Sequence, residues 1–324
     1  MFLTAWIEKL ARDRWLTTGE YARLLRDRTQ ESAALLRRLA DRERRKHYGT
    51  RVYLRGIVDV SSICPNGCVL CSQRIDAECL RYRMRPREIL DCCEEAQGLE
   101  LSNLVLRCGP DRFYSEKMLS VLVERLHRSF PDCSVTLAMG ERSREGLEML
   151  YNAGADRYLL LQETAEKNRF RQLHPPPMCW ERRLHGLNEL KDIGFQTGCG
   201  FLVGWPGQTV EDLSMELKFL EEFQPHSVEL VSLDADGELL SFLISLVRLI
   251  LPNALLTAPG DPAEGVLAGA NVISVGVTPR RDSFPLCGGG RVEGPATIDS
   301  LAALRRELAD VGFEVDMGRD DWNG

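Results

Sequence analysis

No stretch of this 324-residue sequence is apolar over the ~18 consecutive residues that a membrane span needs. The longest candidate, residues 239–251, is interrupted by Ser241, Ser245 and Arg248, so it predicts a buried amphipathic helix. The amphipathic N-terminal segment also lacks the long apolar core and the small-residue cleavage site of a secretory signal. We therefore expect a cytoplasmic protein that has no membrane partner.

The sequence has no excess of basic residues either. Lys and Arg together number 41 against 48 Asp and Glu, which gives a net charge of −7 at pH 7. Nucleic-acid binding usually requires a clustered basic surface. The basic run at 42–46 is interleaved with acids on an expected helix, which favours a solvated helix face. We therefore expect no nucleic-acid partner, and the 44% of hydrophobic residues indicates an ordinary globular protein with a large core.

Short apolar runs alternate with helical patterns from about residue 52 onward, after a helical segment at the N-terminus. Such an alternation favours a parallel sheet, and eight repeats are the number at which the sheet closes into a barrel. An open doubly wound sheet would more often carry a glycine-rich turn after its first strand, where this chain has cysteines. We predict an α/β fold, a (β/α)8 TIM-type barrel over residues 49–324 with an N-terminal helical extension over 1–48. The expected strands are 52–60, 103–108, 134–139, 157–162, 196–203, 227–233, 254–257 and 271–275.

Helices are expected near 86–98, 115–129, 143–153, 179–193, 209–223, 237–250, 262–268 and 299–311. Several of these have a capping residue at the start or a glycine at the end. The predicted starting caps are Ser115, Ser143 and Thr209, and the predicted terminating glycines are Gly98, Gly154 and Gly194. In the N-terminal extension, Thr17 or Thr18 can cap a helix that has Glu20 in its first turn.

Three of the eleven cysteines, Cys64, Cys68 and Cys71, are clustered with the spacing Cys-x3-Cys-x2-Cys. Disulfides are disfavoured in the cytosol, so a cluster of this kind suggests a metal site. Structural zinc usually has four ligands arranged as two pairs, and Cys79 is the only nearby spare. The other eight cysteines, which include the adjacent pair Cys92 and Cys93, are expected to be small buried hydrophobic residues.

Three thiolates suit a [4Fe–4S] cluster in which one iron has no protein ligand, because full ligation takes four cysteines. The open iron can then bind a substrate or a cosubstrate. The motif follows the first expected strand, and the carboxyl ends of the strands are where barrel enzymes have their active sites. The alternatives are a structural zinc site and three unrelated core cysteines.

The motif CPNGCVLC, at residues 64–71, resembles the signature of the radical S-adenosylmethionine (SAM) family. The wider chain resembles the [FeFe]-hydrogenase maturases of the HydE type, to which biotin synthase and methylornithine synthase are related. The segments that carry this resemblance are RYRMRPREIL (81–90), VTLAMGERSRE (135–145), AGADRYLLLQET (153–164), GFLVGWPGQTVEDL (200–213), LAGANVI (267–273) and GRDDW (318–322).

The resemblance implies two cofactors, a [4Fe–4S] cluster held by the three cysteines and SAM bound at the open iron. One electron from the reduced cluster would cleave SAM to a 5′-deoxyadenosyl radical, which would act on a small-molecule or metal-complex substrate inside the barrel. The cofactors carry this chemistry, and the protein positions them and excludes water. A reductant such as a ferredoxin or flavodoxin is the implied partner.

The resemblance also implies roles for individual residues at the strand ends. Gly109 and Asp111 match the segment that accepts hydrogen bonds from the SAM amino group. Glu141 matches an acid near the SAM ribose, and Glu163 a residue that faces SAM and the substrate. Arg183 matches an arginine that pairs with the SAM carboxylate, a bidentate role that suits arginine better than lysine.

Several positions depart from the family pattern. Leu70 stands where an aromatic residue is usual, and Pro110 replaces a glutamate, so the SAM amino group must rely on Asp111 or on backbone carbonyls. The maturases have an arginine where this chain has Leu161. They have a histidine where this chain has Gln162. Gln162 and Thr164 resemble methylornithine synthase at this point, and both are expected to contact the substrate.

Two further features concern the barrel mouth and the C-terminal region. A proline-rich loop after the sixth strand is missing, because residues 230–240 run almost directly into a helix. Cys287 stands alone, which argues against a second cysteine-bound cluster, and His174 is expected to be a structural loop residue. Because the departures fall on the mouth and lining of the barrel, they suggest an altered substrate.

Three functional hypotheses follow. The leading one is a radical SAM enzyme of the hydrogenase-maturase type with a divergent substrate. A second is an amino-acid mutase similar to methylornithine synthase. A third, from another class, is a non-catalytic carrier or scaffold for an iron–sulfur cluster, which reductive cleavage of SAM would exclude.

Overall fold

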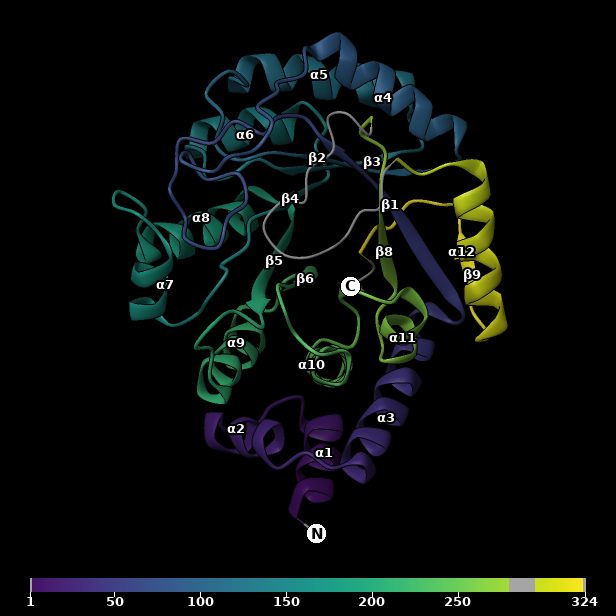
Figure 1. Ribbon diagram of the computed structural model, residues 1–324. Helices are drawn as coiled ribbons and strands as arrows, with labels where there is room; N and C mark the ends of the chain where they lie inside the picture. Colours follow the sequence, from purple (N-terminus) through teal and green to yellow (C-terminus); the bar gives the residue numbers. More distant parts are fainter. Residues whose placement is uncertain (1, 280–294, 323–324) are drawn as a thin grey trace.

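The computed structural model describes residues 2–279 and 295–322 of the chain. Eight parallel strands form a closed ring, because β1 hydrogen-bonds to β2 on one side and to β8 on the other (Figure 1). The architecture is therefore the predicted TIM-type (β/α)8 barrel. The strands of the ring are β1 Arg51–Asp59, β2 Asn103–Arg107, β3 Ser134–Ala138, β4 Arg157–Leu159, β5 Gln196–Val203, β6 Ser227–Ser232, β7 Leu255–Thr257 and β8 Val272–Gly276.

The strands are mostly apolar because helices cover the outer face of the ring while side chains fill its interior. In β1, for example, every residue after Arg51 is buried. This explains why the strands appear in the sequence as short continuous apolar runs rather than as alternating patterns. The covering helices are α4 Pro86–Gly98, α5 Glu116–Ser129, α6 Arg144–Asn152, α7 Lys167–Leu173, α8 Trp180–Ile193, α9 Val210–Phe223, α10 Gly237–Ile250, α11 Pro262–Leu267 and α12 Ile298–Asp310.

Most predicted helix ends are confirmed. The predicted starting caps Ser115, Ser143 and Thr209 each accept a hydrogen bond from the first turn of their helix. The glycines that follow α6 and α8, Gly154 and Gly194, have a left-handed backbone. The prediction for Gly98 is wrong, because α4 includes this residue and the left-handed position is Glu100, with φ 61°. The helix α7 and a short ninth strand, β9 Glu314–Asp316, were not predicted.

Three helices precede the barrel, namely α1 Phe2–Asp13, α2 Thr18–Arg26 and α3 Gln30–Tyr48. They lie outside the ring, where α2 packs against α9 and α3 against α10 (Figure 1). Thr17 and Glu20 form the expected capping box at the start of α2. The apolar residues of these helices join the same buried cluster as the barrel helices, and the division of the chain at residue 48 stays a prediction.

Helix α10 is almost completely buried, which confirms the prediction for the longest apolar stretch. It begins four residues after β6 ends, so the connection is as short as the sequence indicated. No helix in the described part of the chain is both long and apolar enough to cross a membrane.

The C-terminal segment closes the barrel at the amino ends of the strands. Asp320 is fully buried there and accepts hydrogen bonds from Ser134, at 3.0 Å, and from Arg157, at 3.2 Å. Arg55 also donates to Asp320, and the Asp320 backbone N–H donates to Asn103. Since Asn103, Ser134 and Arg157 are the first residues of their strands, this network forms the floor of the barrel.

Candidate active site

A cavity of about 780 Å³ opens at the carboxyl ends of the strands. The loop after β1, the ends of β2, β3 and β4, the start of α8 and part of β6 line it. The cavity therefore lies where TIM-barrel enzymes carry out their chemistry. All three cysteines of the Cys-x3-Cys-x2-Cys motif line it: Cys64, Cys68 and Cys71.

The cysteine loop is held together by one arginine that the sequence analysis did not single out. Arg81 donates hydrogen bonds to the carbonyls of Ser62, Gln73, Arg74 and Ala77, at 2.6 to 3.0 Å. A guanidinium offers five donors in a rigid fork, so a single side chain can gather the carbonyls of a loop that has no regular structure. Its position five residues before α4 gave no signal of this role.

The three thiols differ in exposure. Cys64 is buried, whereas Cys68 and Cys71 are partly exposed. Burial, together with the nearby Glu163 and the other two cysteines, raises the pKa of Cys68 to about 12. The free thiol therefore keeps its proton at neutral pH, and iron must displace that proton when it binds.

The residues around the thiols fit an iron–sulfur cluster. Gly109 passes so close to Cys64 that a Cβ atom at this position would lie 2.9 Å from its Sγ, so only glycine leaves room here. Within residues 2–279 and 295–322, no three Cys, His, Asp or Glu side chains converge as ligands of a single metal ion. Three soft thiolates beside an open cavity are the donor set expected for separate irons of a cluster.

Arg183 connects two of the predicted acids across the cavity wall. Its Nε donates to Glu141 at 2.7 Å, and its Nη1 lies 3.4 Å from Glu163 and also donates to the carbonyl of Leu161. The structure thus brings Glu141, which follows β3, together with Glu163 and Arg183, which both follow β4. Nη2 of Arg183 makes no hydrogen bond to the described residues, so it is available to a ligand.

His174 is a site residue that sequence reasoning assigned only to loop structure. Its Nε2 lies 2.8 Å from Glu163, and its Nδ1 lies 2.8 Å from the carbonyl of Phe170, on whose ring it stacks. The ring of His174 thus lies between a backbone carbonyl and a carboxylate, which are both acceptors. Burial would raise the pKa of Glu163, but the hydrogen bond from His174 and the charge of Arg183 lower it to about 2.

Asp111 lines the cavity, but its carboxylate is already engaged. Both oxygens accept from Arg83, at 2.8 Å each, and they also accept from Ser61 and from the backbone of Phe113. Burial opposes ionisation, but these hydrogen bonds lower the pKa of Asp111 overall. The carboxylate therefore ties the loop after β2 to the cysteine loop.

The structure does not bring Gln162 and Thr164 to the cavity. Both are fully buried, and Gln162 instead donates to Glu216 of α9, at 3.3 Å, and accepts from the backbone of Gly200. Leu161 and Glu163 line the cavity, whereas Gln162 and Thr164 contact Glu216 of α9, so the expected contact with substrate has no support in this geometry.

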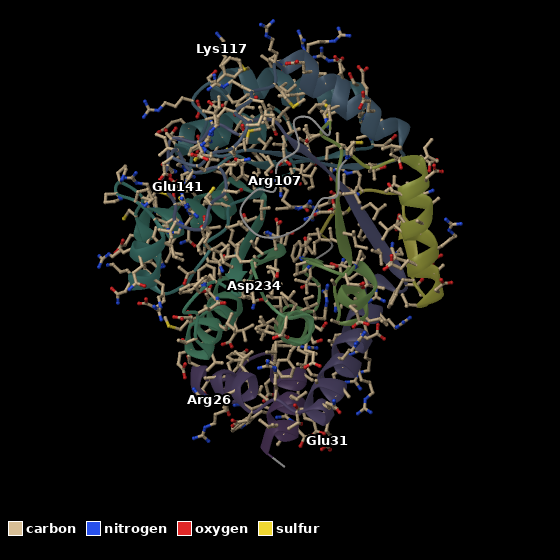
Figure 2. The ribbon with its side chains drawn as sticks, viewed as in Figure 1. Arg26, Glu31, Arg107, Lys117, Glu141 and Asp234 are labelled. Carbon is tan, nitrogen blue, oxygen red and sulfur yellow. The ribbon has the colours of Figure 1, made fainter. Side chains whose placement is uncertain are left out.

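Three charged residues deeper in the barrel were also missed. Asp59 and Arg107 are the last residues of β1 and β2 and form a bidentate pair, with Nε–Oδ1 at 2.7 Å and Nη2–Oδ2 at 3.2 Å. Glu229, from β6, lines the same cavity. Figure 2 shows Arg107 within the ring of strands and Glu141 toward α8. The sequence signal that could have identified them is a charged residue in an otherwise apolar strand.

The remaining cysteines largely match the expectation of small buried residues. Among the described residues outside the motif, five cysteines are buried, whereas Cys79 and Cys179 are partly exposed. The buried ones are Cys92, Cys93, Cys108, Cys133 and Cys199. Cys287 lies outside the described residues.

Comparison with known proteins places this geometry in a family context. The family model of the radical SAM superfamily matches residues 58–220. The chain is 36% identical over 263 residues to the "[FeFe] hydrogenase maturase subunit HydE" of Thermotoga maritima, covering 75% of each chain. It is 24% identical over 288 residues to the 3-methylornithine synthase of Methanosarcina acetivorans, covering 82% of this chain and 81% of that one.

A solved structure agrees with the fold. The crystal structure of methylornithine synthase (PylB) superimposes with a TM-score of 0.83 and 22% sequence identity, covering 96% of this chain and 97% of that one. At this level of identity the likeness establishes the architecture and not the substrate.

Proposed function

The chain belongs to the radical SAM superfamily, and on that premise we propose that Cys64, Cys68 and Cys71 hold a [4Fe–4S] cluster whose open iron binds SAM. When bound, such a cluster supplies the electron that cleaves SAM reductively to a 5′-deoxyadenosyl radical. The observation that carries the proposal is the position of all three thiols on one cavity at the carboxyl ends of the strands.

The residues of the cavity wall have distinct proposed tasks. Gly109 leaves space for the cluster beside Cys64. Arg183 receives the SAM carboxylate with its free Nη2, while Glu141 and Glu163 fix the orientation of its guanidinium. A buried arginine that is already held by two acids loses little side-chain freedom when a ligand binds.

Asp111 does not bind the SAM amino group directly in this proposal. Because its carboxylate is fully used by Arg83, Ser61 and the Phe113 backbone, backbone carbonyls of the segment around Gly109 supply the acceptors for the SAM amino group. Pro110, which replaces the family's glutamate, fits a site that relies on main-chain acceptors.

The overall activity is that of a radical SAM enzyme related to the [FeFe]-hydrogenase maturases, and we propose a divergent substrate. The sequence identity with the maturase subunit supports the relation to the maturases. The divergent substrate is inferred from the cavity lining, where Leu161 stands in place of an arginine. The substrate is a small molecule or metal complex, and a cytoplasmic reductant such as a ferredoxin or flavodoxin supplies the electron.

An amino-acid mutase similar to methylornithine synthase is the second candidate, because that structure superimposes over almost the whole chain. The mutase and the maturase share SAM cleavage and differ in substrate. A non-catalytic cluster carrier shares the cysteines but does not cleave SAM.

The decisive experiment is anaerobic reconstitution with iron and sulfide, reduction with dithionite, addition of SAM and chromatography for 5′-deoxyadenosine. We expect 5′-deoxyadenosine from the wild type, none from Cys68→Ala, and near-normal yield from Cys79→Ala, which removes the nearby spare cysteine. A wild type with a full cluster and no 5′-deoxyadenosine would instead identify a cluster carrier. Equal loss in Cys79→Ala would contradict the three-cysteine ligand set.

A further inference from the structure

Among the described residues that line the cavity, one acidic side chain has no cation beside it. Five acids line the cavity: Asp111, Glu116, Glu141, Glu163 and Glu229. The first four each form an ion pair, with Arg83, Arg142, Arg183 and His174 respectively as a partner. In the described part of the chain, Glu229 has neither an ion pair nor a side-chain hydrogen bond.

The nearest interior cation does not neutralise Glu229. Arg107 is partly exposed, and Asp59 holds its guanidinium through two hydrogen bonds, so its charge is already balanced. The charge of Glu229 helps to raise the pKa of Arg107, which places the two groups within electrostatic reach of each other. No ion pair within 4 Å joins Glu229 and Arg107 among the described residues, so space separates them.

The remaining cationic lining residues lie at the rim. Arg112 and Arg182 are exposed to solvent, whereas Glu229 is the third residue of β6 and lies inside the barrel. The side chains near it in the lining are apolar, with Val231 on the same strand and Leu159 and Leu161 after β4. A carboxylate that is partly withdrawn from water and has no partner is costly, and a ligand of opposite charge removes that cost.

We propose that Glu229 is the anchor of the substrate and binds a protonated amino group of it inside the barrel. Asp59 and Arg107 form a neutral pair beside this anchor, so the described residues there carry one net negative charge, which selects an organic cation. An ammonium has donors that match a carboxylate, and the apolar lining suits the carbon chain that carries it. This inference rests on the proposed function, because it names the substrate class of the same cavity.

The test uses the chain reconstituted with its cluster and supplied with SAM. Pentylamine, 1-pentanol and pentanoate serve as probes, because they share a carbon chain and differ in one terminal group. Each probe is titrated anaerobically, and the thermal unfolding midpoint and the dissociation constant are measured. The variants are Glu229→Gln and, as matched control, Glu222→Gln, which changes an exposed glutamate of α9 whose side chain is 69% accessible.

We expect the wild type and Glu222→Gln to bind pentylamine more tightly than the other two probes. Loss of a charge-assisted hydrogen bond of this kind weakens binding about tenfold to a hundredfold, so Glu229→Gln should lose most of the preference. An equal response of the wild type to all three probes, including no response to any, would overturn the proposal. So would a preference for pentanoate, or an unchanged amine preference in Glu229→Gln.

A second variant tests the charge balance itself. Asp59→Asn leaves the charge of Arg107 uncompensated, so we expect weaker binding of pentylamine and stronger binding of pentanoate. An unchanged preference in this variant counts against the proposed balance of charges.

SAM cleavage by dithionite-reduced protein without added probe separates the two proposals. Normal 5′-deoxyadenosine formation with no amine preference overturns only the anchor. An amine preference in a protein that never cleaves SAM overturns only the enzymatic function.

Discussion

The two ends of the barrel use charged residues in opposite ways. At the amino ends of the strands, Asp320 is fully buried and is surrounded by Arg55, Arg157 and Ser134, so the charges are enclosed and paired. At the carboxyl ends, the three motif cysteines line a cavity together with Arg183 and Glu229, and neither Nη2 of Arg183 nor the carboxylate of Glu229 has a hydrogen-bond partner among the described residues. Paired charges close the first end, and the groups left unpaired at the second are available to ligands.

This contrast predicts that substitutions at the two ends have separable effects. Changes at the floor should alter the free energy of unfolding while the chemistry per folded molecule stays the same. Changes at the mouth should alter ligand binding while the stability of the ligand-free chain stays nearly the same.

The largest effect is expected for Asp320→Asn. This change leaves Arg55 and Arg157 buried without a counter-charge, and breaking such a buried network costs about 3–5 kcal/mol. The unfolding free energy of the cluster-free chain, measured by urea denaturation, should fall by that amount. Asp316→Asn, which alters a half-exposed pair with Arg51 at 3.6 Å, is the control and should change it by less than about 1 kcal/mol.

The same variant tests whether the two ends of the barrel act independently. If Asp320→Asn abolishes 5′-deoxyadenosine formation per intact cluster, the floor and the active site are not independent.

The next effect is expected at the mouth, for Arg183→Lys. Lysine keeps the charge but loses the fork that reaches Glu141, Glu163 and a ligand together, so affinity for SAM should fall about tenfold to a hundredfold. Equilibrium dialysis of the reconstituted protein measures this affinity. Arg182→Lys, at the exposed neighbouring position, is the matched control, and equal losses in both variants would contradict the assigned role.

A smaller effect is expected for Gly109→Ala. The added Cβ would lie 2.9 Å from Sγ of Cys64, and overpacking of this kind costs about 1–3 kcal/mol. We expect lower iron and sulfide content after reconstitution, with the unfolding of the cluster-free chain less affected. Gly98→Ala, in α4, meets no atom within 4 Å and should leave the iron content unchanged. Full cluster content in Gly109→Ala would show that the loop can move aside.

A last effect concerns a buried acid that belongs to neither end of the barrel. Burial raises the pKa of Glu216 from 4.5 to about 8, against the hydrogen bonds it accepts from Ala165, Thr164 and Gln162. Between these two pH values the folded chain keeps a proton that the unfolded chain releases. The contribution to stability is therefore complete below pH 4.5 and declines as the pH rises to about 8, by at most about 1.4 kcal/mol per pH unit.

Glu216→Gln should remove that part of the pH dependence, because glutamine does not titrate. The measurement is urea denaturation of the cluster-free chain at several pH values, with Glu222→Gln as the exposed control. A pH dependence identical in the wild type and in Glu216→Gln would show that Glu216 is ionised in the folded chain.

The fold could be predicted from the sequence because the barrel depends on local patterns. The eight strands, most helix boundaries and the caps at Ser115, Ser143 and Thr209 follow from apolar periodicity and hydrogen-bonding side chains that act within one turn. The short helix α7 was missed because it lies among charged residues, in a segment with no clear apolar period. Strand β9 was missed because its three residues, Glu314–Asp316, include two acids and form no buried apolar run.

The candidate site was predictable only in part. The cysteine spacing identified Cys64, Cys68 and Cys71, and the family segments pointed to Glu141 and Arg183, residues that the structure places on one cavity. The resemblance to methylornithine synthase implied that Gln162 and Thr164 contact the substrate, but both side chains contact Glu216 of α9. Which side chains after β4 face inward depends on the packing of the barrel against its helices, which no local pattern shows.

The sequence by itself determined the fold class, the cysteine motif and the family, since each depends on residues close together in the chain or on segments shared with relatives. Tertiary structure alone decided which distant charges meet. His174 and Glu163 are eleven residues apart, and Arg107 and Glu229 come from β2 and β6. Whether such charges pair depends on barrel closure, which no local pattern encodes. Among residues 2–279 and 295–322, this arrangement leaves Glu229 without an ion pair.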